Sequence, residues 1–189
     1  MKRALFLIFT IFLMAGTQME LKAQNKEKIL IVYYSKTGTT RTVAEYIHQI
    51  VGGDIFEIIP AKSYPVDYQS TTDIAKQEQK ENARPKIASN VKNISEYNTI
   101  FIGFPIWWGT MPMFFFTFLE SHNLAGKTII PFCTHGGGGQ GQSISDIQKL
   151  CPKSTVKEAL ALRGTNNNSK ESVAAWLRGL GLAKSTTPP

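Results

Sequence analysis

The chain has 189 residues, of which 42% are hydrophobic and 19% are charged. That length suits a single domain with enough residues to bury a core, and the composition excludes a disordered protein. The net charge of +7 favours anionic ligands and partners, but no run of lysine and arginine of the kind that binds nucleic acid is present. We therefore interpret the charge as ordinary surface charge and expect no nucleic-acid partner.

The first 23 residues have the layout of a secretory signal peptide. Lys2 and Arg3 form a basic start, a mainly apolar run covers residues 4–16, and Ala23 supplies a small residue before a charged segment. The run is shorter than the ~20 apolar residues that span a bilayer, so cleavage after Ala23 is favoured over an uncleaved anchor or a buried first strand. We expect residues 24–189 to form one domain, exported to the bacterial periplasm, with no membrane insertion of the mature chain.

Strands and helices are predicted to alternate from residue 26 onward. Apolar, β-branched runs predict five strands, at residues 29–34, 55–59, 99–104, 128–133 and 156–162. Apolar spacing or start signals predict helices at residues 40–51, 112–120 and 144–151, and from about Asn168 to Gly181.

A further helix is predicted at residues 73–84, after a loop that begins with Tyr64 and Pro65. It is mainly polar and charged, and we interpret its charges as a solvated face and not as a binding patch; they are Lys76, Glu78, Lys80 and Glu81. The alternation of strands and helices predicts an α/β domain with a parallel sheet covered on both faces. Ligands bind such sheets beyond the carboxyl ends of the strands, which makes the loops after the first, third and fourth strands the candidate sites.

The first of these loops is rich in hydroxyl groups and precedes a helix. Its members are Ser35, Lys36, Thr37, Gly38, Thr39 and Thr40. Free N–H groups and the dipole at a helix N-terminus favour a phosphate there. Neither the Gly-Lys-Ser/Thr ending of a P-loop nor the Gly-x-Gly-x-x-Gly turn is present. This loop alone leaves open both phosphate binding and a polar turn with a threonine cap.

The second loop is aromatic. It starts with Pro105, Ile106, Trp107, Trp108 and Gly109. Neighbouring side chains point in different directions, so one indole could pack inward while the other lines a crevice and stacks on a flat ligand. Core packing of both indoles, or an exposed contact patch, is the alternative.

The third loop is rich in glycine. It starts with Thr134, His135, Gly136, Gly137 and Gly138 and continues to Ser143. Consecutive glycines let backbone N–H groups approach a ligand closely. A mobile surface loop is the alternative.

Together the three loops predict a phosphate at the first loop and a planar ring between the second and third. The pattern Ser35-x-Thr37-Gly38-x-Thr40 resembles the phosphate-binding signature of the flavodoxin family, and residues 105–109 and 132–137 resemble its two flavin-contacting loops. The resemblance covers nearly the whole chain after residue 23. It implies a doubly wound, three-layer α/β/α fold with five parallel strands in the order 2-1-3-4-5.

The resemblance also implies that the chain binds flavin mononucleotide (FMN). Residues 35–40 would hold the phosphate, residues 105–109 would border the isoalloxazine ring, and residues 134–138 would close its other side. The usual aromatic residue of the third loop is replaced by His135 and glycines, which predicts a flavin covered on one face only.

Removal of residues 1–23 leaves a net charge of +5 (18 basic minus 13 acidic). With His135 nearby, this predicts a flavin that is easier to reduce than in acidic flavodoxins.

Two functions follow from an FMN site. We favour an electron carrier that serves a redox protein partner or a small electron acceptor. The alternative is an FMN-dependent NAD(P)H or quinone oxidoreductase, although the sequence has no recognisable nicotinamide site. A third, non-redox possibility is a binder of another phosphorylated ligand.

Cysteines and histidines add two expectations. Cys133 ends the fourth strand, and a helix of about seven residues, roughly 10 Å long, separates it from Cys151. That exceeds the ~7 Å limit for a disulfide, so we expect two free thiols, with Cys133 close to the flavin. The histidines His48, His122 and His135 lack ligand spacing, and no metal site is predicted.

Overall fold

The computed structural model describes residues 27–164 and 169–183. The predicted signal peptide and the predicted helix start at Asn168 lie outside these residues. Within the described ranges, no helix combines the length and the hydrophobicity needed to cross a bilayer.

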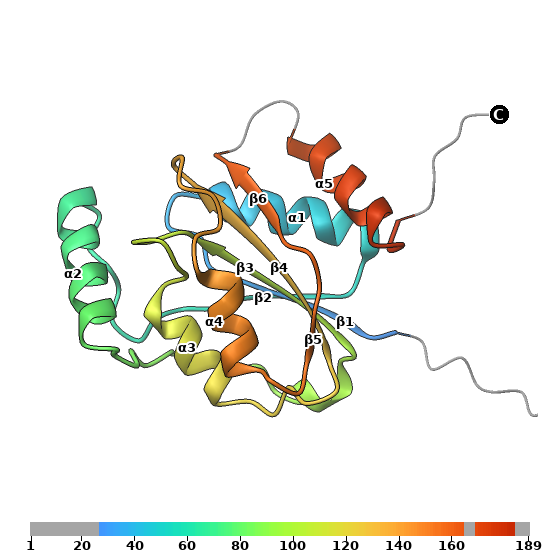
Figure 1. Ribbon diagram of the computed structural model, residues 1–189, viewed down its shortest axis with the longest axis horizontal. Helices are drawn as coiled ribbons and strands as arrows, with labels where there is room; N and C mark the ends of the chain where they lie inside the picture. The colour runs from blue at the N-terminus through green and yellow to red at the C-terminus, as the bar shows by residue number, and fades with distance from the viewer. Residues whose placement is uncertain (1–26, 165–168, 184–189) are drawn as a thin grey trace, which may run out of the picture.

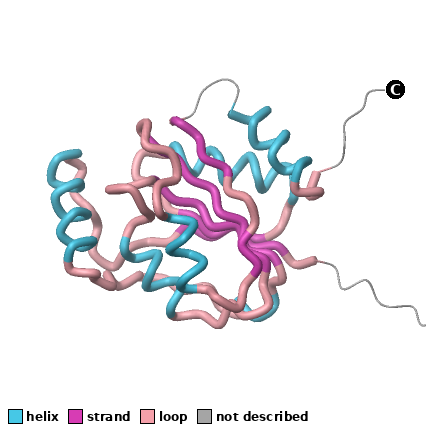
Figure 2. The backbone as a smooth tube through the Cα atoms, in the orientation of Figure 1, coloured by secondary structure: helices cyan, strands magenta, loops and turns pink. Residues whose placement is uncertain are grey.

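A parallel sheet forms the centre of the molecule (Figures 1 and 2). Its strands are β1 (Ile29–Tyr33), β2 (Asp54–Glu57), β3 (Thr99–Pro105), β4 (Thr128–His135), β5 (Thr155–Val156) and β6 (Leu160–Arg163). The order is β2-β1-β3-β4-β5, and β6 also pairs with β4. All pairs are parallel, so the predicted flavodoxin-like order is confirmed.

The two central strands, β3 and β4, pack closely in register. Gly103 of β3 lies opposite Phe132 of β4. A Cβ atom at Gly103 would lie 2.0 Å from the Phe132 ring, so only glycine leaves room for that ring. Both strands are buried along almost their whole length, as expected for strands covered on two faces.

The last strand differs from its prediction. The single strand predicted at residues 156–162 is divided into β5 and β6, both paired with β4. Lys157 and Glu158 are exposed between them, and the Glu158 carbonyl accepts a hydrogen bond from the Trp176 indole at 3.2 Å. That carbonyl is therefore engaged by a helix and not by a neighbouring strand.

Helices cover both faces of the sheet (Figure 1). They are α1 (Thr39–Val51), α2 (Tyr68–Lys80), α3 (Met113–Glu120), α4 (Ser143–Leu150) and α5 (Ser169–Gly179), with a 3₁₀ turn at Ile94–Glu96. On one face, α1 and α5 contribute Ile47 and Leu177 to a buried cluster with Phe101. On the other face, α3 and α4 contribute Phe114 and Ile147 to a second cluster.

Helix α2 is an outlier in both position and bounds. It stands beside the sheet, next to α3, within the excursion that joins β2 to β3 (Figure 1). Its predicted bounds, 73–84, are wrong, since the helix starts at Tyr68 and ends at Lys80. The Asp67 side chain accepts a hydrogen bond from the Ser70 N–H at 2.7 Å, and this N-cap sets the earlier start. Asn82, with φ of 49°, turns the chain away after the helix end.

Candidate functional site

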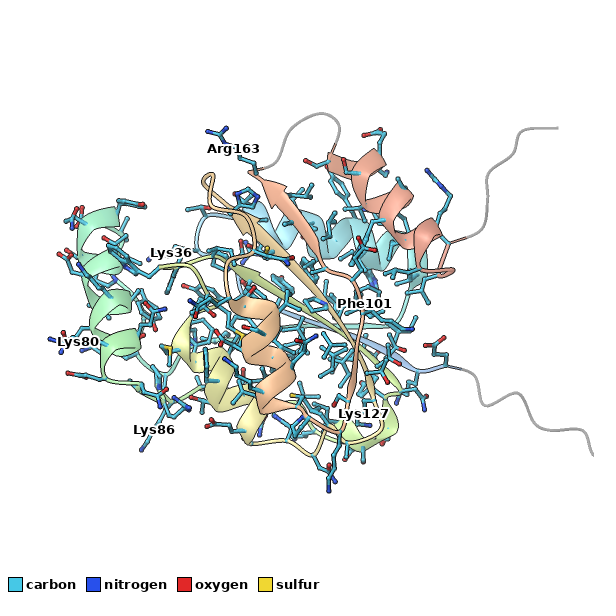
Figure 3. The ribbon with its side chains drawn as sticks, viewed as in Figure 1. Lys36, Lys80, Lys86, Phe101, Lys127 and Arg163 are labelled. Carbon is cyan, nitrogen blue, oxygen red and sulfur yellow. The ribbon has the colours of Figure 1, made fainter. Side chains whose placement is uncertain are left out.

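The carboxyl ends of β1, β3 and β4 open onto a cleft of about 510 Å³. That volume lies in the range of small-molecule sites. All three predicted loops contribute to it, through Lys36, Thr37, Thr39, Thr40, Pro105, Ile106, Trp107, Trp108, Thr134, His135 and Gly136. Figure 3 shows Lys36 reaching from this end of the sheet toward α2. The topology therefore brings together three segments that are far apart in the sequence.

Five of the predicted site residues do not line the cleft. They are Ser35, Gly38, Gly109, Gly137 and Gly138. Two of them support it from behind, since Gly38 starts α1 and Gly109 forms part of the turn that presents Trp108.

One wall of the cleft was missed by the sequence analysis. It is formed by Val66, Tyr68, Thr71, Thr72 and Ala75, while Gly164 contributes at the far side. The charged side chains Lys76, Lys80 and Glu81 are exposed, as interpreted, but another face of α2 lines the cleft. The spacing of residues 68, 71, 72 and 75 follows one helix face, and this spacing was the available signal. The members of this face are mostly small or polar, so they do not read as an apolar stripe.

The first loop leaves an open helix N-terminus. Gly38 adopts φ of +90°, and no side chain caps α1. Its carbonyl accepts the first helical hydrogen bond, from the Thr42 N–H at 3.0 Å. The N–H groups of the first turn thus have no side-chain acceptor. The Ser35 hydroxyl, in the same loop, is buried without a hydrogen-bond partner. This arrangement suits an anion.

A buried hydroxyl pair joins the first and third loops. Thr40 Oγ1 and Thr134 Oγ1 are 2.8 Å apart, and both residues are buried. Each hydroxyl satisfies the other where water is excluded. The pair therefore fixes the start of α1 against the end of β4.

Lys36 connects the first loop to the segment before α2. Its ammonium donates hydrogen bonds to the carbonyl oxygens of Tyr64, at 3.0 Å, and Pro65. The side chain also lines the cleft. It brings a positive charge to the site and fixes the position of the segment that precedes α2.

The second loop forms a tight turn around Trp108. Backbone hydrogen bonds run both ways between Trp107 and Thr110, at 2.8 and 3.2 Å, and the two residues between them have φ of 50° (Trp108) and 80° (Gly109). Two positive φ angles define a type I′ turn, for which Asn-Gly is the usual sequence. A tryptophan at the first of these positions is an outlier.

Contacts with α2 hold Trp108 in this conformation. Its indole N–H donates to the Thr72 carbonyl at 2.8 Å, and its own carbonyl accepts from the Gln79 amide at 3.1 Å. The Lys76 ammonium lies 4.8 Å from the ring centroid. Trp108 is 49% exposed, so its ring remains accessible at the mouth of the cleft.

Trp107 has a different environment. Its ring makes edge contacts with Tyr64 (4.9 Å between centroids) and Tyr34 (5.9 Å), and it packs against the core cluster on the α3–α4 face. It also lines the cleft. As expected, one of the two adjacent indoles packs inward, that of Trp107, and the other, that of Trp108, is exposed at the cleft. Both residues line the cleft.

The second and third loops are in direct contact. The Gln142 N–H donates to the Gly109 carbonyl at 2.7 Å, and Thr110 Oγ1 donates to Asp146 at 2.6 Å. His135, at the start of the third loop, has a buried Nδ1 without a hydrogen-bond partner. An unpaired ring nitrogen of this kind is available to a ligand in the cleft.

Both cysteines are free and buried, so the predicted absence of a disulfide is confirmed. Cys133 packs in the core cluster on the α3–α4 face and does not line the cleft, unlike the position we expected for it. Burial raises the pKa of the Cys133 thiol to about 12 and that of Cys151 to about 11. These thiols are therefore poor nucleophiles. Among the described residues, no three potential metal ligands cluster.

Comparison with known proteins identifies related chains. A family model described as flavodoxin matches residues 28–180. A crystal structure of a flavoprotein from Bacteroides eggerthii has 38% identity and a TM-score of 0.72, over 82% of this chain and 98% of that one. A flavoprotein from Bacteroides uniformis has 35% identity and the same TM-score, over 80% and 98%.

A third related structure contains a ligand. The flavoprotein from Lactobacillus acidophilus, crystallised in complex with FMN, has 25% identity and a TM-score of 0.64. The alignment covers 71% of this chain and 93% of that one. No curated protein matches the chain.

Proposed function

Because this chain belongs to the flavodoxin family, we propose that it binds FMN in the cleft at the carboxyl ends of β1, β3 and β4 and acts in electron transfer. The observation that carries the proposal is the uncapped start of α1 together with the unpartnered Ser35 hydroxyl of the same loop. The FMN complex of the related Lactobacillus acidophilus protein supports the choice of ligand.

The phosphate would lie at the first loop. The free N–H groups of the first turn of α1 and the Ser35 hydroxyl are donors without partners. The hydroxyls of Thr37 and Thr39 lie 3.2 Å apart on the same loop, and both residues line the cleft. The phosphate would thus satisfy groups that the folded chain leaves open. Thr40 gives its hydroxyl to Thr134, so we assign it a supporting role.

The isoalloxazine ring would lie between α2 and the third loop. Val66 is 98% exposed and Tyr68 is 81% exposed, although both line the cleft. Large apolar side chains at a cleft rim gain free energy when a flat ligand covers them. With Trp108 they would form one wall, and residues 134–136 would form the other. The ring would therefore be bordered on both sides, and not on one side as the sequence suggested.

A carrier is favoured over an oxidoreductase by the side chains of the cleft. Bound FMN supplies reversible electron transfer, and the protein supplies binding and electrostatics. The titratable lining residues are Lys36, Tyr68 and His135, and no carboxylate is among them. Lys36 is already engaged by the Tyr64 and Pro65 carbonyls. The lining thus holds no carboxylate that could act as a general base, and this supports the carrier.

We also propose that residues 1–23 direct export and that the mature chain works in the periplasm with a redox partner. The support is the basic start, the short apolar run and Ala23. Expression of the full chain in a Gram-negative host, followed by fractionation and intact mass, tests this. A periplasmic product that begins at Gln24 is expected, and a cytoplasmic product that retains Met1 would contradict it.

FMN binding is tested by titration of the purified chain with FMN, followed by flavin fluorescence. One-to-one quenching is expected, and Ser35→Ala should weaken binding by about tenfold, the value of one hydrogen bond to a charged group. Ser95→Ala, on an exposed turn away from the cleft, is the control and should bind FMN as the wild type does. Unchanged flavin fluorescence with a folded wild-type chain would refute the proposal.

A further inference from the structure

A second cavity of about 510 Å³ lies on the other side of α2, within the excursion between β2 and β3. It is lined by Ala61, Lys62, Ser63, Tyr64, Ile74, Glu78, Ala83, Arg84, Pro85 and Lys86. None of these residues lines the FMN cleft. Helix α2 therefore separates two cavities, with Thr71 and Ala75 facing one and Ile74 and Glu78 facing the other.

The frame of this cavity is held by hydrogen bonds. The Ala61 N–H donates to the Lys86 carbonyl at 2.8 Å, and the Ala88 N–H donates to the Ile59 carbonyl at 2.7 Å. These bonds form a short antiparallel pairing around Pro60 and Ile87. The Thr117 hydroxyl of α3 donates to the Pro85 carbonyl at 2.9 Å. The cavity is thus built on paired backbone and not on a free loop.

Its walls are apolar and its rim is positive. Tyr64, Ile74, Ala83 and Pro85 supply apolar surface. Three cationic side chains, Lys62, Arg84 and Lys86, face one carboxyl group, Glu78. An excess of positive charge over an apolar floor suits an anion with an apolar body.

The three cationic side chains of the rim differ in whether they already have a partner in the protein. The Arg84 guanidinium is engaged by Glu120, at 2.7 and 2.8 Å, and by the backbone of Asn82 and Ala83. Lys62 and Lys86 are exposed, and within the described part of the chain neither forms an ion pair with a carboxylate. The two ammonium groups are therefore the free cations of the rim. The backbone pairing of Ala61 with Lys86 places them on adjacent segments.

Glu78 is the one carboxyl group in this lining, and it is engaged within the protein. One of its oxygens accepts a hydrogen bond from the Tyr64 hydroxyl at 2.7 Å. Burial raises the pKa of Glu78, while the Tyr64 hydrogen bond and the charge of Lys62 act in the opposite direction.

We propose that this cavity is a second ligand site, which takes a small organic acid with an aromatic or branched apolar body. The carboxylate lies between Lys62 and Lys86, and the apolar body lies against Ile74, Ala83 and Pro85. Tyr64 lies between the two cavities, because its hydroxyl faces Glu78 while its ring contacts Trp107 of the FMN cleft. The proposal does not depend on FMN binding.

The test uses 2-naphthoate as the probe and the full chain with an excess of FMN, so that the first cleft is not available to the probe. Binding is followed by calorimetry, and the site is located by the shifts of the Ile74 methyl resonances. Naphthoate is expected to bind at least tenfold more tightly than 2-naphthylmethanol, which has the same ring without the charge. No binding at millimolar naphthoate, or equal binding of the two probes, would overturn the proposal.

Charge-removing variants test whether Lys62 and Lys86 bind the carboxylate of the probe. Lys62→Gln/Lys86→Gln should weaken naphthoate binding at least fivefold. The matched control, Lys80→Gln/Lys92→Gln, removes the same charge from exposed positions of the same excursion that do not line the cavity, and it should change binding less than twofold. Figure 3 shows Lys80 on α2 and Lys86 beyond its end. Equal losses in both double variants would mean non-specific attraction and would overturn the site. Weaker naphthoate binding with excess FMN present than with FMN absent would also overturn it.

Discussion

Gly141 lies directly against the carbonyl oxygen of Gly109, so a Cβ atom at Gly141 would come within 2.0 Å of that oxygen. The next residue, Gln142, donates its N–H to the same carbonyl at 2.7 Å. The two loops proposed to border the isoalloxazine ring therefore share one contact, which has no space for a side chain.

Gly141→Ala is expected to separate these two loops and to weaken FMN binding by at least tenfold. The φ of +53° at Gly141 adds a backbone cost of ~1–2 kcal/mol for alanine. FMN titration and thermal unfolding measure the two effects. The control is Gly138→Ala, where a Cβ meets nothing within 4 Å and φ lies outside the left-handed region. Similar losses in both variants would show that general loop stiffness, and not this contact, is responsible.

Trp108→Asn is expected to preserve stability and to weaken FMN binding by about tenfold. Asparagine suits the left-handed position of a type I′ turn, which relieves ~1 kcal/mol. That gain offsets the loss of the indole hydrogen bond to Thr72, worth about 1 kcal/mol. Trp176→Phe, on α5 against Phe101 of β3 and outside the cleft lining, should lower the free energy of unfolding and leave FMN affinity unchanged. If Trp108→Asn binds FMN as the wild type does, Trp108 has no role at the ring.

Thr40 and Thr134 should show strong coupling in a double-mutant cycle on the FMN-free chain. Either single replacement by valine leaves a buried hydroxyl unsatisfied, at a cost of about 1–3 kcal/mol. The double variant replaces both with similar apolar groups, so it should cost less than the sum of the singles. Urea unfolding measures the three free energies. Strict additivity would mean that the hydroxyl pair contributes nothing through its mutual bond.

The stability of the chain should respond to the protonation of Glu78. Its folded pKa is raised above the ordinary value of 4.5, chiefly by burial, so the folded state binds more protons than the unfolded state in the window above pH 4.5. The contribution of Glu78 to the free energy of unfolding therefore falls as the pH rises through this window. Glu78→Gln, which keeps an acceptor for the Tyr64 hydroxyl, should gain stability relative to the wild type from pH 4 to pH 7.

Glu120→Gln supplies a control of opposite sign. The Arg84 guanidinium lowers the pKa of Glu120, so this carboxylate stabilises the fold once it is ionised. Its replacement should therefore lose stability relative to the wild type as the pH rises from 3 to 6. Urea unfolding over this pH range measures both variants, and parallel pH profiles for the two would contradict the assignment.

His135→Ala should lower the reduction potential of bound FMN. The buried Nδ1 of His135 has no partner in the protein and lines the cleft, where it can interact with the ring as negative charge develops on reduction. Spectroelectrochemistry measures the potential, and His48→Ala, on α1 and outside the cleft lining, is the control. An unchanged or higher potential in His135→Ala would refute this role.

The central strands could be predicted from the sequence because burial on both faces produces long apolar runs. Ile29–Tyr33 and Thr128–His135 are examples. The division of the last strand could not be predicted in this way. Between β5 and β6, the Glu158 carbonyl is bonded to the Trp176 indole of a helix that follows later in the chain, and this contact leaves no local signal in the sequence.

The three loops of the site could be predicted from the sequence because hydroxyl, glycine and indole groups are concentrated in them. The contribution of α2 to the cleft wall was not predicted, because Thr71, Thr72 and Ala75 lack the apolar character of a helix face that packs on a core. The cleft, and not a core, lies against this face, so hydrophobic periodicity carries little information about it. Nor does the sequence reveal that Thr40 is already paired with Thr134.

The division of the final strand into β5 and β6 also affects whether a second chain can add a strand to the edge of the sheet. A long, regular outer strand would expose a row of free N–H and C=O groups to which another polypeptide could add. Here β5 has two residues, and the exposed Lys157 and Glu158 interrupt the border before β6 begins. The opposite border, β2, has four residues and carries Asp54 and Glu57 at its ends. Both borders of the sheet therefore resist intermolecular strand addition, which would protect the chain from aggregation before it acquires its cofactor.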